Sequence, residues 1–247
     1  MGEIFQRYEL KYLINAQTRE ILEQAFETYM RPDEHGESTI CNVYYDTPDD
    51  RLIRRSLEKP IYKEKLRMRS YGMAAPDSKV FLELKKKYDG IVYKRRISLK
   101  ESKAEEYLCA KSLHRQTLLP SNSQIGREID YFCDYYGELI PKVYLCYDRT
   151  AYFAKGDPNL RITFDRRIRW RQTGLSLTET PGGRELLEGG QSLMEIKTGT
   201  AMPLWLVQLL SREQIRQTSF SKYGRAYQCI RSGINEIKLQ NGGNHCA

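Results

Sequence analysis

The stretch KEKLRMRSYG, residues 63–72, alternates charged and apolar side chains in a segment with the composition of a β-strand. Successive side chains of a strand point to opposite faces of the sheet. The two faces of this strand therefore differ: Lys63, Lys65, Arg67 and Arg69 share one, and Leu66 and Met68 share the other. Because charged residues are mostly exposed, a solvated outer face is the simplest interpretation of this strand taken alone.

Five further segments repeat the pattern, which changes that interpretation. Their same-face charges are Glu9 and Lys11; Glu83, Lys85 and Lys87; Lys94 and Arg96; Arg161, Asp165 and Arg167; Glu195 and Lys197. The predicted helices carry apolar stripes that need an apolar sheet face to pack against. If the apolar faces turn outward to the helices, the charged faces turn inward. Two cations about 6 Å apart repel by roughly 3 kcal/mol at an effective dielectric near 20, so such an interior needs water and a bound anion.

Period-2 patterns rich in Tyr, Val, Ile and Phe predict eight strands. They span Ile4–Ile14, Ile40–Asp46, Ile61–Tyr71, Lys79–Lys87, Ile91–Leu99, Pro141–Ala154, Asn159–Arg169 and Ser192–Thr198. Helices are predicted over Ala16–Met30, Pro48–Ser56, Ser102–Leu113, Arg127–Tyr136, Pro203–Gln214 and Ser221–Ser232. Short connections such as Asp89-Gly90 favour antiparallel hairpins, and Gly182–Gly190 is a candidate loop or lid. We predict an α+β fold, a mostly antiparallel closed β-barrel with helices packed outside.

The bulk properties predict one soluble domain with a polyanionic ligand. Residues 1–236 are expected to form the domain and residues 237–247 a disordered polar tail. The net charge of +8 indicates a polyanionic partner. No run of about 18 apolar residues exists, so no transmembrane segment is expected. The six cysteines form no C-x-x-C pair and the N-terminus has no signal-peptide pattern, so we expect reduced thiols and a cytoplasmic location.

Phosphate chains suit the predicted interior. Arginine offers two parallel donors to phosphate oxygens, and lysine offers a compact charge. The interleaved carboxylates would weaken binding of a bare polyanion, but they suit Mn²⁺ or Mg²⁺ that bridges phosphate oxygens. The carboxylates in these rows are Glu9, Glu83, Asp165 and Glu195.

Nine short motifs in order resemble the VTC domain, the catalytic domain of polyphosphate polymerases, within the triphosphate tunnel metalloenzyme (CYTH) superfamily. They are Tyr8–Tyr12, Tyr44–Thr47, Lys65–Gly72, Phe81–Lys85, Tyr93–Arg96, Tyr147–Tyr152, Arg161–Asp165, Glu195–Lys197 and Ser219–Tyr223. Each motif is weak alone, whereas nine in this order over nearly the whole chain are specific. The first strand departs from the superfamily's E-x-E-x-K pattern, because Arg7 stands where the first Glu would be.

The resemblance implies roles for individual residues. Arg67, Arg69, Arg149 and Arg161 would grip and stabilise the transferred phosphoryl group, and Glu195 would be the principal metal ligand. The remaining phosphate contacts would come from Lys11, Lys85, Lys94, Tyr147, Ser221 and Lys222. To these the charge pattern adds Glu9, Glu83 and Asp165 as auxiliary metal-binding or water-positioning groups.

The resemblance implies a metal-dependent enzyme that makes polyphosphate from ATP, with Mn²⁺ or Mg²⁺. Two alternatives use the same tunnel: a triphosphatase, in which water is the acceptor, and a non-catalytic sensor of polyphosphate or nucleotide. Nucleic acid is not an expected partner, because the charged rows lack interleaved aromatic side chains on the same face. Neither a P-loop nor a G-x-G-x-x-G motif is present.

Overall fold

The computed structural model describes residues 8–89, 91–115, 117, 119, 123–199 and 201–233. Its strands are β1 (Tyr8–Ile14), β2 (Met30–Pro32), β3 (Ser38–Asp46), β4 (Tyr62–Tyr71), β5 (Lys79–Tyr88), β6 (Ile91–Lys100), β7 (Ile140–Ala154), β8 (Arg161–Arg171), β9 (Arg184–Glu185) and β10 (Ser192–Thr198). Its helices are α1 (Ala16–Tyr29), α2 (Arg51–Leu57), α3 (Glu101–Ser112), α4 (Gln124–Tyr136), α5 (Leu204–Arg212) and α6 (Lys222–Ser232).

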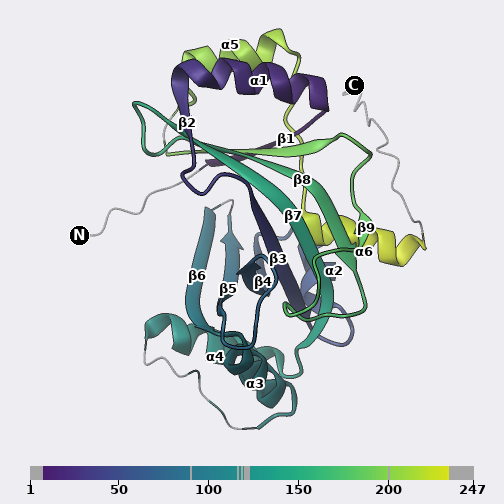
Figure 1. The fold of residues 1–247 in the computed structure, drawn as a ribbon. Helices are drawn as coiled ribbons and strands as arrows, with labels where there is room; N and C mark the ends of the chain where they lie inside the picture. The colour runs from purple at the N-terminus through teal and green to yellow at the C-terminus, as the bar shows by residue number, and fades with distance from the viewer. Residues whose placement is uncertain are drawn as a thin grey trace.

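All strands belong to one antiparallel sheet, with the order β1-β10-β8-β7-β3-β4-β5-β6 and with β2 and β9 added beside β7 and β8. The sheet is strongly curled (Figure 1). The expected antiparallel α+β architecture is confirmed, but the sheet is not closed into a barrel. Closure requires the two edge strands to approach to about 4.8 Å, and no ladder joins β1 to β6 in the part of the chain that the structure describes.

Side chains bridge the opening that the backbones leave. Lys85 Nζ on β5 lies 3.9 Å from Glu9 Oε2 on β1, although these strands stand near opposite ends of the sheet. Register shifts in β3–β7 and β7–β8 add local bends to this curl. The alternating pattern is the same for a closed barrel and for a curled open sheet, so the sequence could not separate the two.

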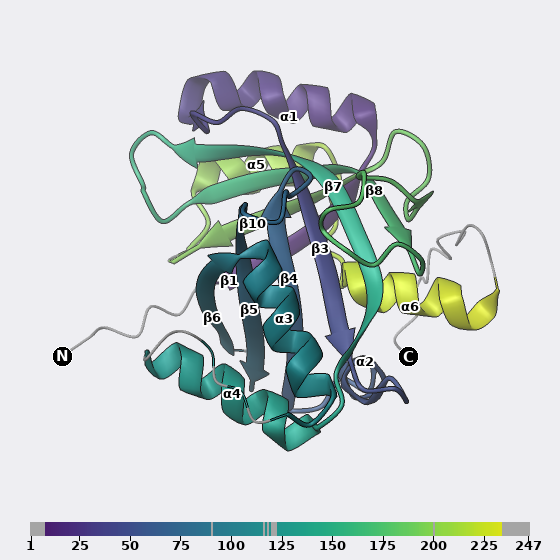
Figure 2. The same ribbon diagram turned by 60° about the horizontal axis from the view of Figure 1, so that its bottom comes forward.

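Two apolar clusters hold helices on the convex side of the sheet. Leu22 and Phe26 of α1 pack with Phe164 of β8, in a cluster that also includes α5. Tyr107 of α3 and Ile129 of α4 pack with β4 and β5 side chains in the second cluster. Figures 1 and 2 show α1 and α5 together at one end of the molecule and α3 and α4 at the other. The outward-facing apolar rows of the sheet are therefore covered by helices, as predicted.

Helix α6 occupies a different position from the one predicted. Its Tyr223 stacks on Tyr44 with ring centroids 4.7 Å apart, and Tyr44 shares its face of β3 with Asn42, a partner of Arg69. A third apolar cluster joins α6 to this concave side of β3 and β7. The interior is consequently part aromatic and part ionic, and α6 does not pack outside with the other helices.

The predicted strands and helices match the observed ones within a few residues, apart from two short strands, β2 and β9, that the sequence patterns missed. Strand β9 lies inside the predicted loop at residues 182–190. Residues 4–7, residue 90 and the predicted tail 237–247 lie outside the described residues. Among the described helices, none is both long and apolar enough to span a bilayer, and the five described cysteines are free thiols.

Candidate active site on the concave face

The charged rows meet on the concave face in two ion clusters. The first, here the Glu83 cluster, consists of Glu83 with Arg67, Arg69, Lys94 and Arg96. The second, here the Asp165–Glu195 cluster, consists of Asp165 and Glu195 with Lys11, Arg149 and Lys222. The predicted convergence of these side chains on an interior is therefore present in the structure.

Glu83 is the centre of the first cluster and is only 1% exposed. Arg67 Nε and Nη2 donate to Glu83 Oε2 at 2.8 and 2.7 Å. Lys94 Nζ and Arg96 Nε reach Oε1 at 2.8 and 2.6 Å from the neighbouring strand β6. Burial alone would raise the pKa of Glu83, but Arg67, Arg69 and Lys94 outweigh it and hold that pKa well below its usual range. One buried carboxylate thus positions cations from two strands.

Polar groups of β3 and β7 fix the two arginines further. Arg67 Nη1 donates to Tyr44 Oη at 3.0 Å. Arg69 Nε donates to Asn42 Oδ1 at 2.9 Å, and its Nη2 donates to Tyr147 Oη at 3.2 Å. Tyr147 therefore lies beside Arg69 in the interior.

Asp165 organises the second cluster and is fully buried. Arg149 Nε and Nη2 donate to its two oxygens at 2.6 and 2.7 Å, a bidentate pair. Lys222 Nζ, at the start of α6, lies 2.5 Å from Asp165 Oδ2 and 3.1 Å from Glu195 Oε1. Burial would lower the pKa of Arg149, but Asp165 raises it well above its ordinary value. These contacts hold both cations charged.

Glu195 is held more loosely than Asp165. Lys11 Nζ is 3.6 Å from Glu195 Oε1 and 3.2 Å from Glu9 Oε1, so one ammonium lies against both carboxylates. Arg149 Nη2 is 3.4 Å from Glu195 Oε2. Burial raises the pKa of Glu195, but Lys222 and then Lys11 and Arg149 bring it well below its ordinary value. Lys85 and Lys197 complete the surroundings of Glu9 at 3.9 Å each.

The start of α6 brings Ser221 and Lys222 into the same interior. Ser221 is the N-cap of the helix, and its Oγ accepts a hydrogen bond from Gly224 N at 3.1 Å. Lys65 Nζ donates to the same oxygen at 3.0 Å. The first turn of α6 therefore lies beside Lys65 of β4. The N–H groups of a first helical turn favour a bound anion.

Arg161 lies apart from the other predicted cations. Its side chain is 37% exposed, its Nη2 is 3.6 Å from Asp33 Oδ2, and its guanidinium lies over the ring of Phe153. It begins strand β8, four residues before Asp165. The structure thus places Arg161 at the rim, in neither cluster.

The arrangement of the four interior carboxylates determines whether a divalent metal fits. The four carboxylates do not gather into one cage, because Glu83 is surrounded by its own cations, and the described residues contain no group of three acidic, His or Cys side chains placed to hold a metal. Asp165 already accepts short contacts from Arg149 and Lys222. Glu195 has longer contacts, with Lys222 at 3.1 Å, Arg149 at 3.4 Å and Lys11 at 3.6 Å, and Lys11 also contacts Glu9. The residues fit a Mg²⁺ or Mn²⁺ ion held by one or two carboxylates and by phosphate oxygens, not an all-protein cage.

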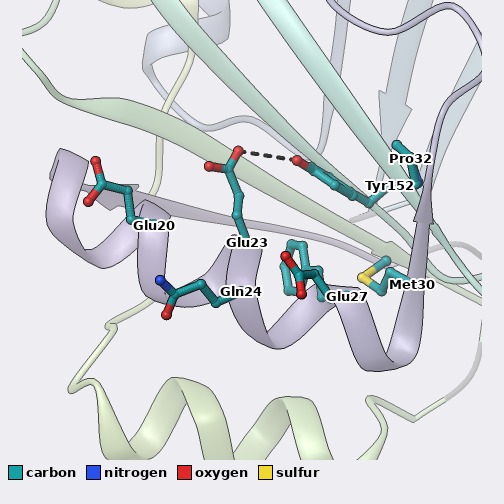
Figure 3. Close-up of a pocket in the computed structure, with 8 residues that line it drawn as sticks. Glu20, Glu23, Gln24, Glu27, Met30, Pro32 and Tyr152 are labelled. Atoms are coloured by element: carbon teal, nitrogen blue, oxygen red, sulfur yellow. Dashed lines mark hydrogen bonds between the residues drawn. The ribbon is translucent and has the colours of Figure 1, made fainter.

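A hollow on the outside of the molecule has the wrong charge for a phosphate chain. It is lined by α1, β2 and Tyr152 of β7, and Figure 3 shows Glu20, Glu23 and Glu27 beside it. Tyr152 Oη donates to Glu23 Oε1 at 3.2 Å across it. No lysine or arginine is among the described residues that line it, so this groove would repel a polyanion.

Several residues of the interior, Lys197 and Tyr44 among them, were not among the predicted site residues. Lys65 and Arg96 stand on charged faces that the alternating pattern identifies, so this pattern could have predicted them as site residues. Asn42 was missed because it is an uncharged residue between the apolar neighbours Cys41 and Val43, and no sequence pattern marks it.

Comparison with known proteins identifies the family. The family model of the VTC domain matches residues 6–231, which is nearly the whole chain. The chain therefore belongs to the VTC domain family, which confirms the resemblance seen in its motifs. No curated protein matches the sequence.

Solved structures share the fold at low sequence identity. A candidate adenylyl cyclase from Hippeastrum, with a dominant triphosphatase activity, is 18% identical with a TM-score of 0.51, over 95% of this chain and 98% of that one. A candidate adenylate cyclase from Bacillus halodurans is 17% identical with a TM-score of 0.53, over 90% of this chain and 96% of that one. Both likenesses concern the fold.

Proposed function

We propose that this protein transfers phosphoryl groups on a triphosphate or polyphosphate chain with a divalent metal, and that it makes polyphosphate from ATP. One observation carries the proposal: among the described residues in and beside the two ion clusters, cations outnumber carboxylates by ten to four. The cations are Lys11, Lys65, Arg67, Arg69, Lys85, Lys94, Arg96, Arg149, Lys197 and Lys222, and the carboxylates are Glu9, Glu83, Asp165 and Glu195. Such an excess needs a multiply charged anion, and a triphosphate supplies one.

The chain's own residues bind and orient the phosphates. Arg67, Arg69 and Arg149 present guanidinium groups whose directions are set by Glu83, Asn42 and Asp165, so little reorganisation is needed when charge develops on the transferred group. Lys94 and Lys222 add point charges from β6 and α6. Arg161 at the rim would contact a phosphate further along the chain.

Glu195, assisted by Glu9, would hold the metal, which would supply positive charge to offset the charge that develops on the phosphates. Glu83 and Asp165, surrounded by cations, act as positioning groups for the arginines. An oxygen of the acceptor phosphate attacks the γ-phosphorus of ATP in line. The bond from that phosphorus to the β–γ bridging oxygen breaks, and ADP leaves with the bond electrons. No protein nucleophile is required.

The test is the size distribution of products formed from ATP with Mn²⁺ or Mg²⁺. Long phosphate chains and ADP are expected. Free phosphate as the sole product would replace the proposal with a triphosphatase, the dominant activity of the Hippeastrum protein of similar fold. Binding of ATP without turnover, with either metal, would indicate a non-catalytic sensor. Lys86→Gln is a matched control, because Lys86 pairs with Glu64 and Glu128 and not with the clusters.

A further inference from the structure

Lys65 differs from the cations of the two ion clusters because it has no carboxylate partner. Within the described residues, no acidic oxygen lies within 4 Å of its Nζ, and its hydrogen bond goes to Ser221 Oγ at 3.0 Å. By contrast, Arg67 and Lys94 pair with Glu83, and Lys85 lies 3.9 Å from Glu9. A cation held in the interior without a counterion is costly to the folded protein.

Like charges surround this lysine. Lys85 stands directly opposite it in the β4–β5 register, and Lys63 and Arg67 flank it on the same face of β4. Burial, then Lys85, Lys63, Lys11 and Arg67, lower the pKa of Lys65 to about 7. From α6, the neighbours are the neutral groups of Ser221 and Tyr223, whose ring centroid is 6.0 Å away. Nothing in these surroundings supplies a negative charge.

The first turn of α6 meets Lys65 at Ser221. The helix has 11 residues, and the N-cap oxygen of Ser221 accepts from Gly224 N while Lys65 donates to it. Free N–H groups of a first helical turn favour an anion. We propose that Lys65 and the first turn of α6 form a phosphate subsite, with Lys65 as a direct ligand. The inference rests on the proposed function, and it adds a binding residue to that same site.

The experiment compares Lys65→Met with Lys86→Met as a matched control. Lys86 is on the opposite face of β5 and pairs with Glu64 and Glu128. Calorimetric titration with inorganic tripolyphosphate, without metal or nucleotide, measures the affinity. We expect Lys65→Met to weaken binding about 10-fold or more, as loss of one charge-assisted contact does. Lys86→Met should bind as the wild type does, and Lys65→Arg should recover part of the loss.

Thermal unfolding without any anion separates a ligand from a structural group. Removing an unpaired cation among like charges should leave the melting temperature of Lys65→Met unchanged or raise it, while the increase caused by tripolyphosphate becomes smaller. Wild-type tripolyphosphate affinity in Lys65→Met would overturn the inference, and so would a melting temperature lowered without anion. If the methionine variant does not fold, Lys65→Gln takes the same two measurements.

The two proposals fail separately. If the wild type makes polyphosphate but Lys65→Met retains full affinity for tripolyphosphate, the subsite is wrong and the proposed function stands. If no metal supports turnover of ATP but Lys65→Met loses affinity, the subsite stands and the proposed function is wrong.

Discussion

Substituting Asp165 by Asn tests whether this carboxylate organises the cations of the interior. Asp165 is fully buried and accepts two hydrogen bonds from Arg149, at 2.6 and 2.7 Å, and a contact from Lys222 at 2.5 Å. Removing one partner of a buried ion pair costs about 3–5 kcal/mol, because the remaining charges lose their compensation. Asn retains one acceptor oxygen, so we expect about 3 kcal/mol. For a chain of this size, that corresponds to a melting temperature about 6–12 °C lower.

Differential scanning calorimetry in metal-free buffer measures this loss. Asp49→Asn is the control, because the Asp49–Arg54 pair is more than half exposed and should shift the melting temperature little. Added tripolyphosphate should recover part of the stability of Asp165→Asn, since it supplies the missing negative charge. A melting temperature within about 2 °C of the wild type, without metal, would refute the organising role. A loss seen only with metal present would instead make Asp165 a metal ligand.

Four other substitutions have distinct outcomes. Glu195→Gln should abolish metal-dependent turnover of ATP and leave the circular dichroism spectrum unchanged. Wild-type turnover rates would contradict the assignment of Glu195 as the metal ligand. Arg67→Ala should weaken tripolyphosphate binding by roughly 1.5–3 kcal/mol, measured by calorimetry. Arg161→Ala should weaken it by less, because Arg161 is at the rim. A larger loss of affinity in Arg161→Ala than in Arg67→Ala would contradict the site. Burial and neighbouring Glu105 raise the pKa of Glu101 to about 7, so stability present below about pH 4.5 is lost as the pH rises through 7. In thermal unfolding, Glu101→Gln should remove that dependence and be more stable than the wild type at pH 8; an unchanged pH profile would contradict this.

Much of the candidate site was predictable from strand parity. Arg67 and Arg69 on β4, Glu83 on β5 and Glu195 on β10 share the concave face because each lies an even number of residues from its charged neighbours. The period of two is a property of any strand, so it needs no tertiary information. Parity cannot say how far along the interior a side chain stands, and Arg161, which shares its predicted face with Asp165, lies at the rim.

The sequence by itself determined the family, the antiparallel strands and the side of the sheet on which the charges stand, because alternation and motif order are local properties of the chain. Only the tertiary structure decided that the sheet stays open between β1 and β6, that α6 enters the concave side, and that Glu83 forms a cluster of its own. These outcomes depend on how strands distant in the chain curl towards one another. Contacts such as the one between Lys85 and Glu9 arise from that curl, and no local pattern encodes them.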